Sequence, residues 1–586
     1  MRWRSSPTAS RRRKWRRSSR TSTSRLTSAI SKSTCTNWGK IGLPAHPFNH
    51  PHRMRPRFDE DRGRSCFLSR YTQTPATLDA MAKVVVIGAG VGGATAAALL
   101  ARAGHEVTLL EAHVYPGGCA GTFYHQRYRF DAGATLAGGF QPGGPHALVG
   151  QMLEIEWRVA PVDPAWQVVL PDRVITQHAD REAWHEELTR AFADLPQREA
   201  IRRFFIAAER VSDAVWRFAA RRPAWPPSSI PDLFRTAAAL RPDTLIALPH
   251  LFETMGAWAR RSGVTDPRAL TFLDAQLLIS AQTTSAHASA LFGAAAVDLP
   301  RKGVVHPEGG IGGISEQLVE AVRRFGGQVL FRQEVTRLEV REGTVIAAHT
   351  NKGLRVPCDV CIANLTPWDL ARLLGDAVPP RLARETHTRA EPWGAFTLYL
   401  GIEDDPHVDH PDHIQVVRSY DAPLGEGNTL FMSFSSRDDT SRAPKGHRAL
   451  TLSTHTRLAE WWRLRETPGL KQAYDDRVAE YTERLLDLAE RAVPGLRQRI
   501  RLQLHGTPVT FQFYTRRHRG GVGGFPFTSV FAARGPWTGL RNAWLVGDSI
   551  FPGQSTAGVT MGALRVCDEV LRAFPAPRPL PRVEVA

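Results

Sequence analysis

The chain is poor in cysteine and lacks long hydrophobic runs. Six cysteines in 586 residues do not indicate a disulfide framework. No apolar stretch approaches the roughly 18 residues that a transmembrane helix needs, so the sequence predicts no membrane-spanning helix. Internal repeats are also absent, which excludes the solenoid and propeller classes.

Signals for metal sites and for activated nucleophiles are also missing. Cys358 and Cys361 form a C-x-x-C pattern, but within an apparent strand, where positions three apart face opposite sides. No second pair completes a zinc site, and no H-E-x-x-H occurs. "GQSTAG" has the wrong spacing for a nucleophile elbow. The sequence therefore predicts no metal, and it indicates no catalytic residue.

Acidic residues are almost absent from the first 80 residues. This leader holds 18 Lys and Arg but only 4 Asp and Glu, so it carries +14 of the net charge of +18. We expect residues 1–80 to be disordered, because so few apolar residues cannot offset chain entropy. Met81 is followed directly by "AKVVVIGAG", so we interpret the leader as upstream sequence read in frame. A transit peptide and a tail that binds nucleic acid or anionic membranes are the alternatives.

The stretch "KVVVIGAGVGG", just after the leader, has the pattern of a buried strand followed by a glycine-rich turn. Residues 83–87 are apolar and β-branched, as expected of a strand buried on both faces of a parallel sheet. Gly88, Gly90 and Gly93 give the G-x-G-x-x-G spacing of a dinucleotide-binding turn. A helix over about residues 94–103 follows, and the N–H groups at its start would bind a pyrophosphate.

A second strand, "HEVTLLEA", ends in an acid. Glu111 stands 18 residues after Gly93, where a carboxylate can accept hydrogen bonds from ribose hydroxyls. Strand, glycines, helix, strand and acid in this register predict a dinucleotide site. Three neighbours belong to the same predicted site: Val91, Gly92 and Ala112.

The far end of the chain favours a flavin. Residues 543–546 form another buried strand, then come Gly547 and Asp548, and a helix begins at about Ala557. An acid at this strand end could bind the ribityl hydroxyls of a flavin. The helix behind it could stabilise negative charge on the reduced ring.

Four segments carry a resemblance to a known family. "PGGCAGTFYHQRYRFDAGAT", "HPEGGIGGISEQLVEAV", "TPVTFQFYTRRHRGGVGG" and "GDSIFPGQSTAGV" together resemble the phytoene desaturase-type flavoproteins, over about residues 83–571. The resemblance is strongest to the branch with the carotenoid isomerases and the carotenoid 3′,4′-desaturases. It implies that Gly118 lies beside the pyrophosphate, that Val335 offers its backbone to the adenine, and that Asp548 and Val559 lie at the ribityl chain and flavin. Cys119 stands where many amine-oxidase relatives carry arginine, which puts a salt bridge to the pyrophosphate in doubt.

The resemblance and the glycine signals predict an α/β fold, with a Rossmann-like FAD-binding domain of the amine-oxidase and phytoene-desaturase superfamily. We assign residues 81–150, 300–370 and 530–575 to this domain. Residues 151–299 and 371–529 form a discontinuous α+β substrate domain, and residues 576–586 are a tail.

Three classes of function follow. The first is a carotenoid desaturase with non-covalent FAD, in which hydride loss from an allylic carbon is followed by proton loss. The conjugated polyene stabilises the cation, so no acid–base pair is required. The second is a carotenoid cis–trans isomerase using reduced FAD. The third is a flavin-free, escort-type isoprenoid-binding protein, which the intact glycines, Glu111 and Asp548 argue against.

A carotenoid is almost insoluble in water, so we expect a cytoplasmic protein that is peripherally associated with a membrane surface and has no nucleic acid partner. The region from Arg202 to Arg261 is the candidate for docking. It combines a helix whose apolar positions have helical spacing, several arginines, and Trp216, Trp225, Phe234 and Trp258. The alternative is an ordinary helix whose apolar stripe is core. The oligomeric state is not predicted.

Overall fold

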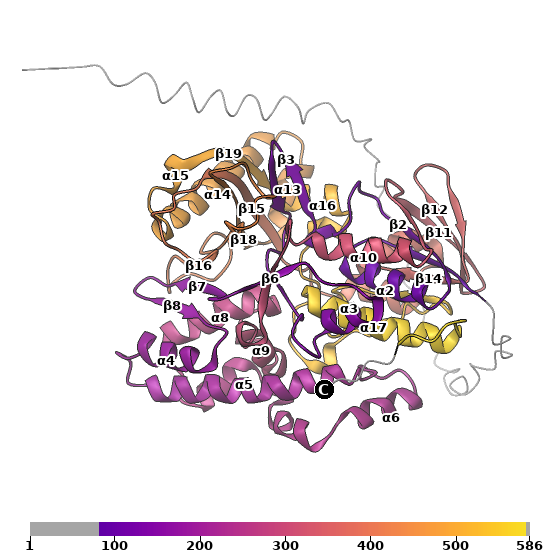
Figure 1. The fold of residues 1–586 in the computed structure, drawn as a ribbon, viewed down its shortest axis with the longest axis horizontal. Helices are drawn as coiled ribbons and strands as arrows, with labels where there is room; N and C mark the ends of the chain where they lie inside the picture. Colours follow the sequence, from indigo (N-terminus) through magenta and orange to yellow (C-terminus); the bar gives the residue numbers. More distant parts are fainter. Residues whose placement is uncertain (1–80, 582–586) are drawn as a thin grey trace, which may run out of the picture. The chain divides into compact units, whose positions relative to one another are not determined.

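The computed structural model describes residues 81–581, so the expectations for the leader and for residues 582–586 lie outside it. A parallel five-stranded sheet, in the order β10-β2-β1-β14-β20, is formed by three distant parts of these residues (Figure 1). In register, Val86 of β1 lies between Leu109 of β2 and Ile362 of β14. The strands are β1 (Lys83–Ile87), β2 (Glu106–Leu110), β10 (Gln328–Leu330), β14 (Val360–Ala363) and β20 (Ala543–Leu545).

The apolar run of β1 is buried as its sequence predicts. Val84, Val85 and Val86 are at most 1% exposed, and burying each side chain stabilises the fold by roughly 1.5–3 kcal/mol. Three helices pack around this sheet, with α10 and α17 both against α2. They are α2 (Val91–Arg102), α10 (Gly313–Arg324) and α17 (Thr556–Ala573). α2 begins three residues earlier than predicted, because the last glycines of the motif form its first turn.

An antiparallel sheet follows β10 and precedes β14. It has the order β11-β12-β13, and α11 packs against β11. Cys361 lies in β14 and Cys358 lies just before it, and both thiols are buried and free. Within residues 81–581, no group of three or more His, Cys, Asp or Glu side chains could hold a metal ion. The elements are β11 (Val335–Arg341), β12 (Thr344–Thr350), β13 (Arg355–Pro357) and α11 (Pro367–Leu374).

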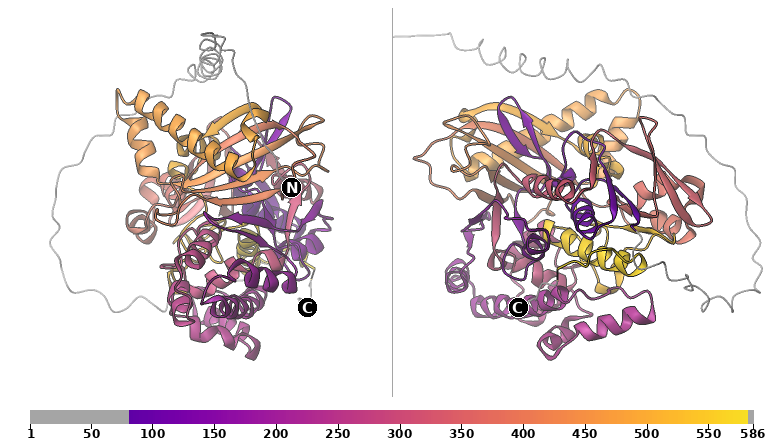
Figure 2. Two further views of the ribbon diagram at one scale, coloured as in Figure 1. Left: turned by 90° about the vertical axis from the view of Figure 1, so that its left-hand side faces the viewer. Right: turned by 45° about the vertical axis from the view of Figure 1, so that its right-hand side comes forward.

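A second large sheet has seven strands in the order β19-β15-β18-β17-β16-β7-β8, and its two faces differ sharply. The helix α14 (Lys471–Ala492) packs on one face of this sheet. Leu398, Leu452 and Met432 of the sheet form an apolar core with Leu485 of α14. Side chains at alternate positions of these strands face the other way. Among them are five buried polar residues: Thr397, Thr451, Ser433, His413 and Gln415. Figure 2 gives two further views of the fold. The strands are β7 (Trp166–Val169), β8 (Val174–Gln177), β15 (Gly394–Glu403), β16 (His413–Val417), β17 (Thr429–Phe434), β18 (His447–Thr456) and β19 (Ile500–Gly506).

Helices α4 to α9 follow one another in the chain, and all of them except α6 contribute to a separate apolar core that also includes residues of β7 and β8. The predicted amphipathic helix is present as α5, and its stripe of Ile201, Phe204 and Phe205 is at most 3% exposed. These helices are α4 (Arg181–Ala191), α5 (Arg198–Ala220), α6 (Ile230–Ala239), α7 (Met255–Arg261), α8 (Pro267–Ala281) and α9 (Ala290–Val297), with the 3-10 helix η2 (Pro242–His250) between α6 and α7.

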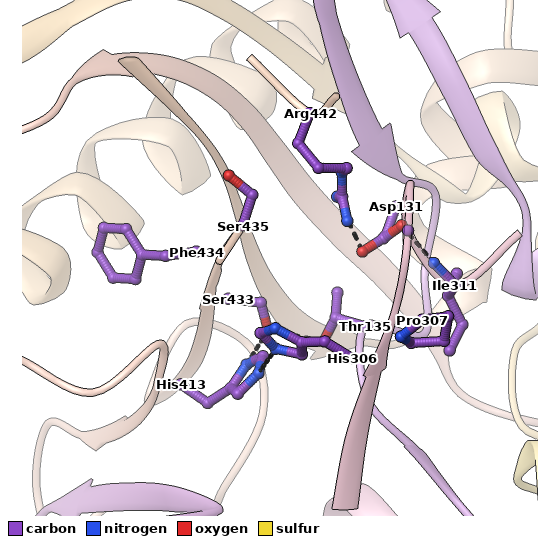
Figure 3. A pocket seen from close by; sticks show the side chains of 11 residues that line it. Asp131, Thr135, His306, Pro307, Ile311, His413, Ser433, Phe434, Ser435 and Arg442 are labelled. Atoms are coloured by element: carbon purple, nitrogen blue, oxygen red, sulfur yellow. Dashed lines mark hydrogen bonds and ion pairs between the residues drawn. The ribbon is translucent and has the colours of Figure 1, made fainter. Parts of the chain in front are cut away.

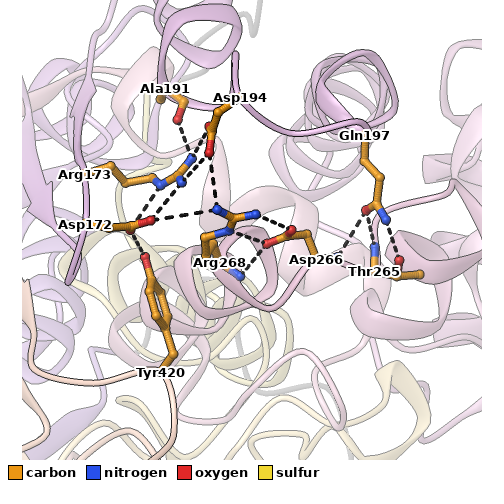
Figure 4. Close-up of polar contacts among 9 residues, drawn as sticks. All are labelled: Asp172, Arg173, Ala191, Asp194, Gln197, Thr265, Asp266, Arg268 and Tyr420. Atoms are coloured by element: carbon orange, nitrogen blue, oxygen red, sulfur yellow. Dashed lines mark hydrogen bonds and ion pairs between the residues drawn. The ribbon is translucent and has the colours of Figure 1, made fainter.

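A network of charged side chains ties the loop between β7 and β8 to the start of α8 (Figure 4). Arg173 pairs with Asp172 at 2.9 Å and with Asp194 at 3.0 Å, and Arg268 pairs with Asp194 at 3.2 Å. The hydrogen bond from Arg173 lowers the pKa of Asp172 to about 2. Tyr420 donates a hydrogen bond to Asp172 and brings in the loop after β16.

Shorter elements connect the two large sheets. The hairpin of β3 and β4 leads into a sheet of order β5-β9-β6. These strands are β3 (Thr122–His125), β4 (Tyr128–Asp131), β5 (Ala137–Gly138), β6 (Val159–Val162) and β9 (Val304–Pro307). The remaining helices are α3 (Pro145–Leu153), α12 (Pro380–Thr388), α13 (Leu458–Glu466), α15 (Leu496–Arg499) and α16 (Pro508–Thr515). None of the helices in residues 81–581 has the length and apolar character to cross a membrane.

His146 of α3 is buried without a polar partner. Its ring stacks on Phe140 at 4.4 Å, and neither ring nitrogen has a hydrogen-bond partner among the described residues. Burial lowers the pKa of His146 to about 3. The unfolded chain therefore binds a proton at a higher pH than the folded protein does. The stability linked to this neutral ring is complete above pH about 6.5, the ordinary value for histidine, and is lost as pH falls below it.

We predict that His146→Leu makes the protein less sensitive to acid. At pH 5 the parent should have lost roughly 2 kcal/mol through this one ring, a loss that the variant cannot suffer. Denaturant midpoints at pH 7.5 and pH 5 measure the difference. His387→Leu, at an exposed histidine, is the control and should follow the parent. An equal acid loss in His146→Leu and the parent would contradict the prediction.

Candidate functional site

The glycine turn between β1 and α2 forms the centre of the site. Gly88 has a φ of +92°, which few residues other than glycine adopt. A Cβ at Gly93 would lie 2.1 Å from the Gly88 carbonyl oxygen, so α2 can approach β1 only with glycine there. Gly90 precedes α2 without a side-chain cap. The first N–H groups of α2 therefore remain able to bind an anion.

Asn364, which sequence reasoning missed, fills the space beside this turn. It follows β14, and its Nδ2 donates a hydrogen bond to the Gly88 carbonyl at 3.3 Å. A Cβ at Gly90 would lie 2.7 Å from Asn364 Nδ2, and one at Gly547 would lie 2.8 Å from its Oδ1. Asn364 thus fixes the distance between the ends of β1 and β20. Its position at the end of a third parallel strand was the available signal.

Glu111 lies at the end of β2, beside the glycine turn. Its Oε2 accepts a hydrogen bond from the Ala89 N–H, and its Oε1 accepts one from the His113 N–H, both at 2.7 Å. Burial raises the pKa of Glu111, although these N–H groups, that of Ala112 and the charge of Arg516 oppose the rise. The carboxylate therefore links two backbone segments and keeps lone pairs for hydroxyl donors.

Val335 reaches the same region through the backbone. The Gln333 N–H donates to the Glu111 carbonyl at 2.8 Å, so the segment leading into β11 runs along residues 111–113. Val335 itself is buried at the start of β11. This places its backbone next to the end of β2.

Gly117 and Gly118 form a second glycine-containing turn, which lies against the glycine turn between β1 and α2. Gly117 forms an isolated parallel bridge with Gly90, and its N–H donates to the Ala89 carbonyl at 3.0 Å. Gly118 has a φ of +56°, and a Cβ there would meet nothing within 4 Å. The backbone at Gly118 therefore borders open space at the same edge of the sheet.

An ion pair lies at the end of β20. Asp548 Oδ2 contacts Arg517 Nη2 at 2.9 Å. Burial lowers the pKa of Arg517, but the facing Asp548 carboxylate more than offsets this, and the pKa lies above its ordinary value. Arg517 also lowers the pKa of the Cys119 thiol, which burial raises. Cys119 stands at the position where many amine-oxidase relatives carry an arginine. In this chain, Arg517 places a positive charge beside that position. Arg517 lies in one of the four segments that carry the family resemblance, but its role here was not predicted.

The start of α17 offers unpaired hydroxyls. Ser555 caps the helix by accepting a hydrogen bond from the Gly558 N–H at 3.0 Å. The buried Oγ1 atoms of Thr556 and Thr560 have no hydrogen-bond partner among the described residues. Val559 lies between them, half-buried, in the first turn. Orphaned hydroxyls beside a helix N-terminus fit a polar ligand with negative charge.

Most of the predicted residues therefore follow the ends of β1, β2 and β20, whereas Val335 begins β11 and Val559 lies in the first turn of α17. Carboxyl ends of parallel strands meet at one edge of a sheet, where α/β proteins bind ligands. The glycine cradle, the Glu111 carboxylate and the orphaned hydroxyls of α17 together fit an extended dinucleotide. The part that each residue plays toward a cofactor stays a prediction.

Three comparisons with known proteins agree with this geometry. Residues 86–149 match the family described as the NAD(P)-binding Rossmann-like domain. The chain is 26% identical to a chloroplastic prolycopene isomerase of an Oncidium hybrid, over 83% of both chains. It is 26% identical to a lycopene-forming phytoene desaturase of a Paracoccus strain, over 83% of this chain and 96% of that one. An oxidoreductase from Methanosarcina mazei has a TM-score of 0.56 at 18% identity, over 83% of this chain and all of that one.

These matches confirm the resemblance to the phytoene desaturase-type proteins and the α/β fold with a Rossmann-like domain. They also confirm that the chain is an enzyme. They do not distinguish a desaturase from an isomerase.

We predict that Glu111→Ala weakens FAD binding by roughly 1–3 kcal/mol, because ribose hydroxyls would lose their acceptor. Fluorescence titration of the flavin-free protein measures the affinity. Glu106→Ala, an exposed acid on the same strand, is the matched control and should bind as the parent does. Equal affinity of Glu111→Ala and the parent would show that the carboxylate serves only the backbone of Ala89 and His113.

Proposed function

We propose that the protein is an FAD-dependent carotenoid desaturase of the 3′,4′ type, with a long polyene as substrate. The observation that carries the proposal is the arrangement of Gly88, Gly93 and Glu111 at one edge of the parallel sheet, in a chain that is similar, over most of its length, to enzymes named for carotenoids. An escort-type binder without flavin would not need Gly88, Gly93 and Glu111 in this arrangement.

We propose that different residues of the site bind different parts of FAD. The turn at Gly90 and the start of α2 would bind the pyrophosphate, and Glu111 would bind the adenosine ribose. Asp548 and the Thr556 hydroxyl would bind the ribityl chain, and Arg517 would supply positive charge near the flavin. FAD, when bound, supplies the acceptor for a hydride. We propose that it binds without a covalent link.

A carotenoid isomerase with reduced FAD is the second candidate, because a prolycopene isomerase is among the relatives. The two candidates differ in redox balance. A desaturase removes two hydrogens and lengthens the conjugated system, whereas an isomerase leaves the mass unchanged.

Residues 81–586 produced in a carotenoid-making host should yield a pigment two mass units lighter per new double bond, with absorption at longer wavelength. Chromatography with mass spectrometry measures both changes. A changed retention time at unchanged mass would support the isomerase instead. Gly93→Val is the control, since its Cβ would collide with the Gly88 carbonyl, and it should leave the pigments unaltered. Pigments unaltered by the parent as well would contradict both candidates.

We further propose that the protein collects its substrate from a bilayer, with a docking surface that differs from the sequence-based one. The apolar stripe of α5 is core, and Trp258 is only 3% exposed, so neither is available to lipid. Trp225 is half-buried, and its Nε1–H donates to the Val530 carbonyl. Within the predicted region, Phe234 remains a candidate, at 72% exposed.

Nine exposed large apolar side chains lie on or beside α6 and η2, whereas others, such as Val114 and Tyr124, lie elsewhere. Phe252 is 84% exposed, and its ring stacks on that of Phe531 at 5.3 Å. Arg241, between α6 and η2, is exposed and could meet anionic headgroups. We call this set the α6 surface: Ile230, Leu233, Phe234, Leu240, Leu245, Ile246, Leu248, Phe252 and Phe531.

We predict that Phe234→Ser with Phe252→Ser releases the protein from liposomes. Removing two inserted aromatic rings should weaken binding at least tenfold, since each contributes roughly 1.5–3 kcal/mol when buried in lipid. Sedimentation with anionic vesicles measures the bound fraction. The control pair is Val114→Ser with Tyr124→Ser, which alters exposed apolar residues outside the α6 surface. Release in the control pair alone, or in neither variant, would contradict the α6 surface as the docking site.

A further inference from the structure

A chain of hydrogen-bonding side chains crosses from the sheet of β9 to the polar face of the seven-stranded sheet (Figure 3). Thr135 Oγ1 and Ser433 Oγ lie 2.6 Å apart, and Ser433 Oγ lies 2.9 Å from His413 Nδ1. The Nε2 atoms of His413 and His306 are in direct contact. The two rings meet edge to face at 4.6 Å. Four side chains from four segments thus form one continuous path.

The far end of this path reaches a carboxylate. His306 Nδ1 lies 3.9 Å from Asp412 Oδ2, which is beyond direct hydrogen-bond distance, so a rotation of the carboxylate would have to close the gap. Asp412 is 28% exposed and also pairs with Arg448 through its other oxygen. His413 and Ser433, by contrast, are at most 7% exposed. The middle of the path, at Ser433 and His413, is therefore buried, whereas Asp412 contacts solvent.

Once the gap to Asp412 is closed by rotation of its carboxylate, one direction follows for every hydrogen bond of the path. An ionised carboxylate only accepts, so His306 then donates from Nδ1 and accepts at Nε2. His413 then donates from Nε2 and accepts at Nδ1 from the Ser433 hydroxyl. Ser433 in turn accepts from the Thr135 hydroxyl. All four donors point from Thr135 toward Asp412, so a proton that enters at Thr135 can leave at Asp412.

Burial favours the neutral form of both imidazole rings, in which each ring can carry a proton between its nitrogens. Burial lowers the pKa of His306 and that of His413. For His306, the Asp412 and Asp131 carboxylates oppose this effect and Arg442 and Arg448 add to it. For His413, His306 and the same two arginines add to it. A neutral imidazole can accept a proton on one nitrogen while it releases one from the other.

The near end of the path adjoins the candidate site. Thr135 follows Ala134, whose N–H donates to the Cys119 carbonyl at 3.1 Å. Cys119 lies close to the ion pair, since the charge of Arg517 lowers the pKa of its thiol and the charge of Asp548 raises it. Thr135 is itself half-buried, unlike Ser433 and His413, which follow it in the path. Its hydroxyl can therefore face a ligand held next to Cys119.

We propose that Thr135, Ser433, His413 and His306 form a proton relay that carries the proton released by the polyene to Asp412. The inference rests on the proposed desaturation. The polyene loses a hydride, which the oxidised flavin accepts, and a proton from the neighbouring carbon, whose C–H electron pair becomes the new double bond. That proton passes to Thr135 and leaves through Asp412. A polyene cation is a strong acid, so a hydroxyl backed by imidazole suffices as its base.

Ser433→Ala tests the relay, because it removes the central hydroxyl and little volume. We expect kcat to fall at least tenfold, KM and flavin content to stay within twofold, and the solvent deuterium isotope effect on kcat to change. Ser453→Ala, on the same face of the neighbouring strand β18, is the matched control and should behave as the parent. Ser433→Thr, which restores the hydroxyl, should recover most of kcat. An active parent whose kcat and isotope effect survive Ser433→Ala would overturn the relay, but not the proposed desaturation.

A second measurement does not depend on turnover. Nitrogen-15 NMR of labelled histidines in the flavin-loaded parent should show His413 protonated at Nε2 and His306 protonated at Nδ1 at pH 7.5. In Ser433→Ala, the His413 Nδ1 resonance should shift because it loses its donor, while the control leaves it unchanged. The opposite tautomers would overturn the relay even in a protein that converts no polyene. The expected tautomers with no polyene conversion would uphold the path and contradict the proposed function alone.

Discussion

The contact between α2 and β1 is the constraint on which the candidate site depends. Gly93 brings the helix so close to the Gly88 carbonyl that no larger side chain fits. This proximity aims the N-terminus of α2 at the carboxyl edge of the sheet, where Gly117 bridges to Gly90 and Glu111 binds the Ala89 N–H. Asn364 then sets the separation from Gly547. A single steric condition therefore positions backbone groups from four segments of the chain.

The seven-stranded sheet meets a different requirement, because it is buried on both faces, and one of these faces is polar beside an aromatic cluster around Tyr399. The side toward α14 is a conventional core. The other side carries buried Thr, Ser, His and Gln side chains, which are costly unless they bond to one another. Gln276 shows such pairing, since it accepts from the Trp166 indole at 3.0 Å and donates to Gln415 at 2.8 Å. This polar face is where a proton could move through the protein without crossing bulk water.

The sequence was informative wherever the signal was local. The strand at residues 83–87, its glycine turn and the acid at Glu111 lie within 30 residues, and all were predictable from spacing and side-chain type. The helix near residues 201–222 was equally clear, but its environment was not. Periodicity shows that α5 has an apolar stripe, whereas only the packing of distant residues such as Trp258 shows that the stripe is core. Arg517 and Asn364 were missed because their contacts join segments 31 or more residues apart.

The order of strands in the parallel sheet has a consequence for biosynthesis. β1 pairs with residues of β14 that lie 276 positions later, and β14 pairs with residues of β20 that lie 182 positions beyond that. A ribosome therefore releases β1, α2 and β2 long before β14 and β20 exist. Sequence-distant pairing of this kind folds slowly and leaves apolar surface uncovered in the meantime. We therefore expect the buried valines of β1 and the alanine-rich face of α2 to stay partly uncovered in the nascent chain until the last strand has emerged, which favours aggregation.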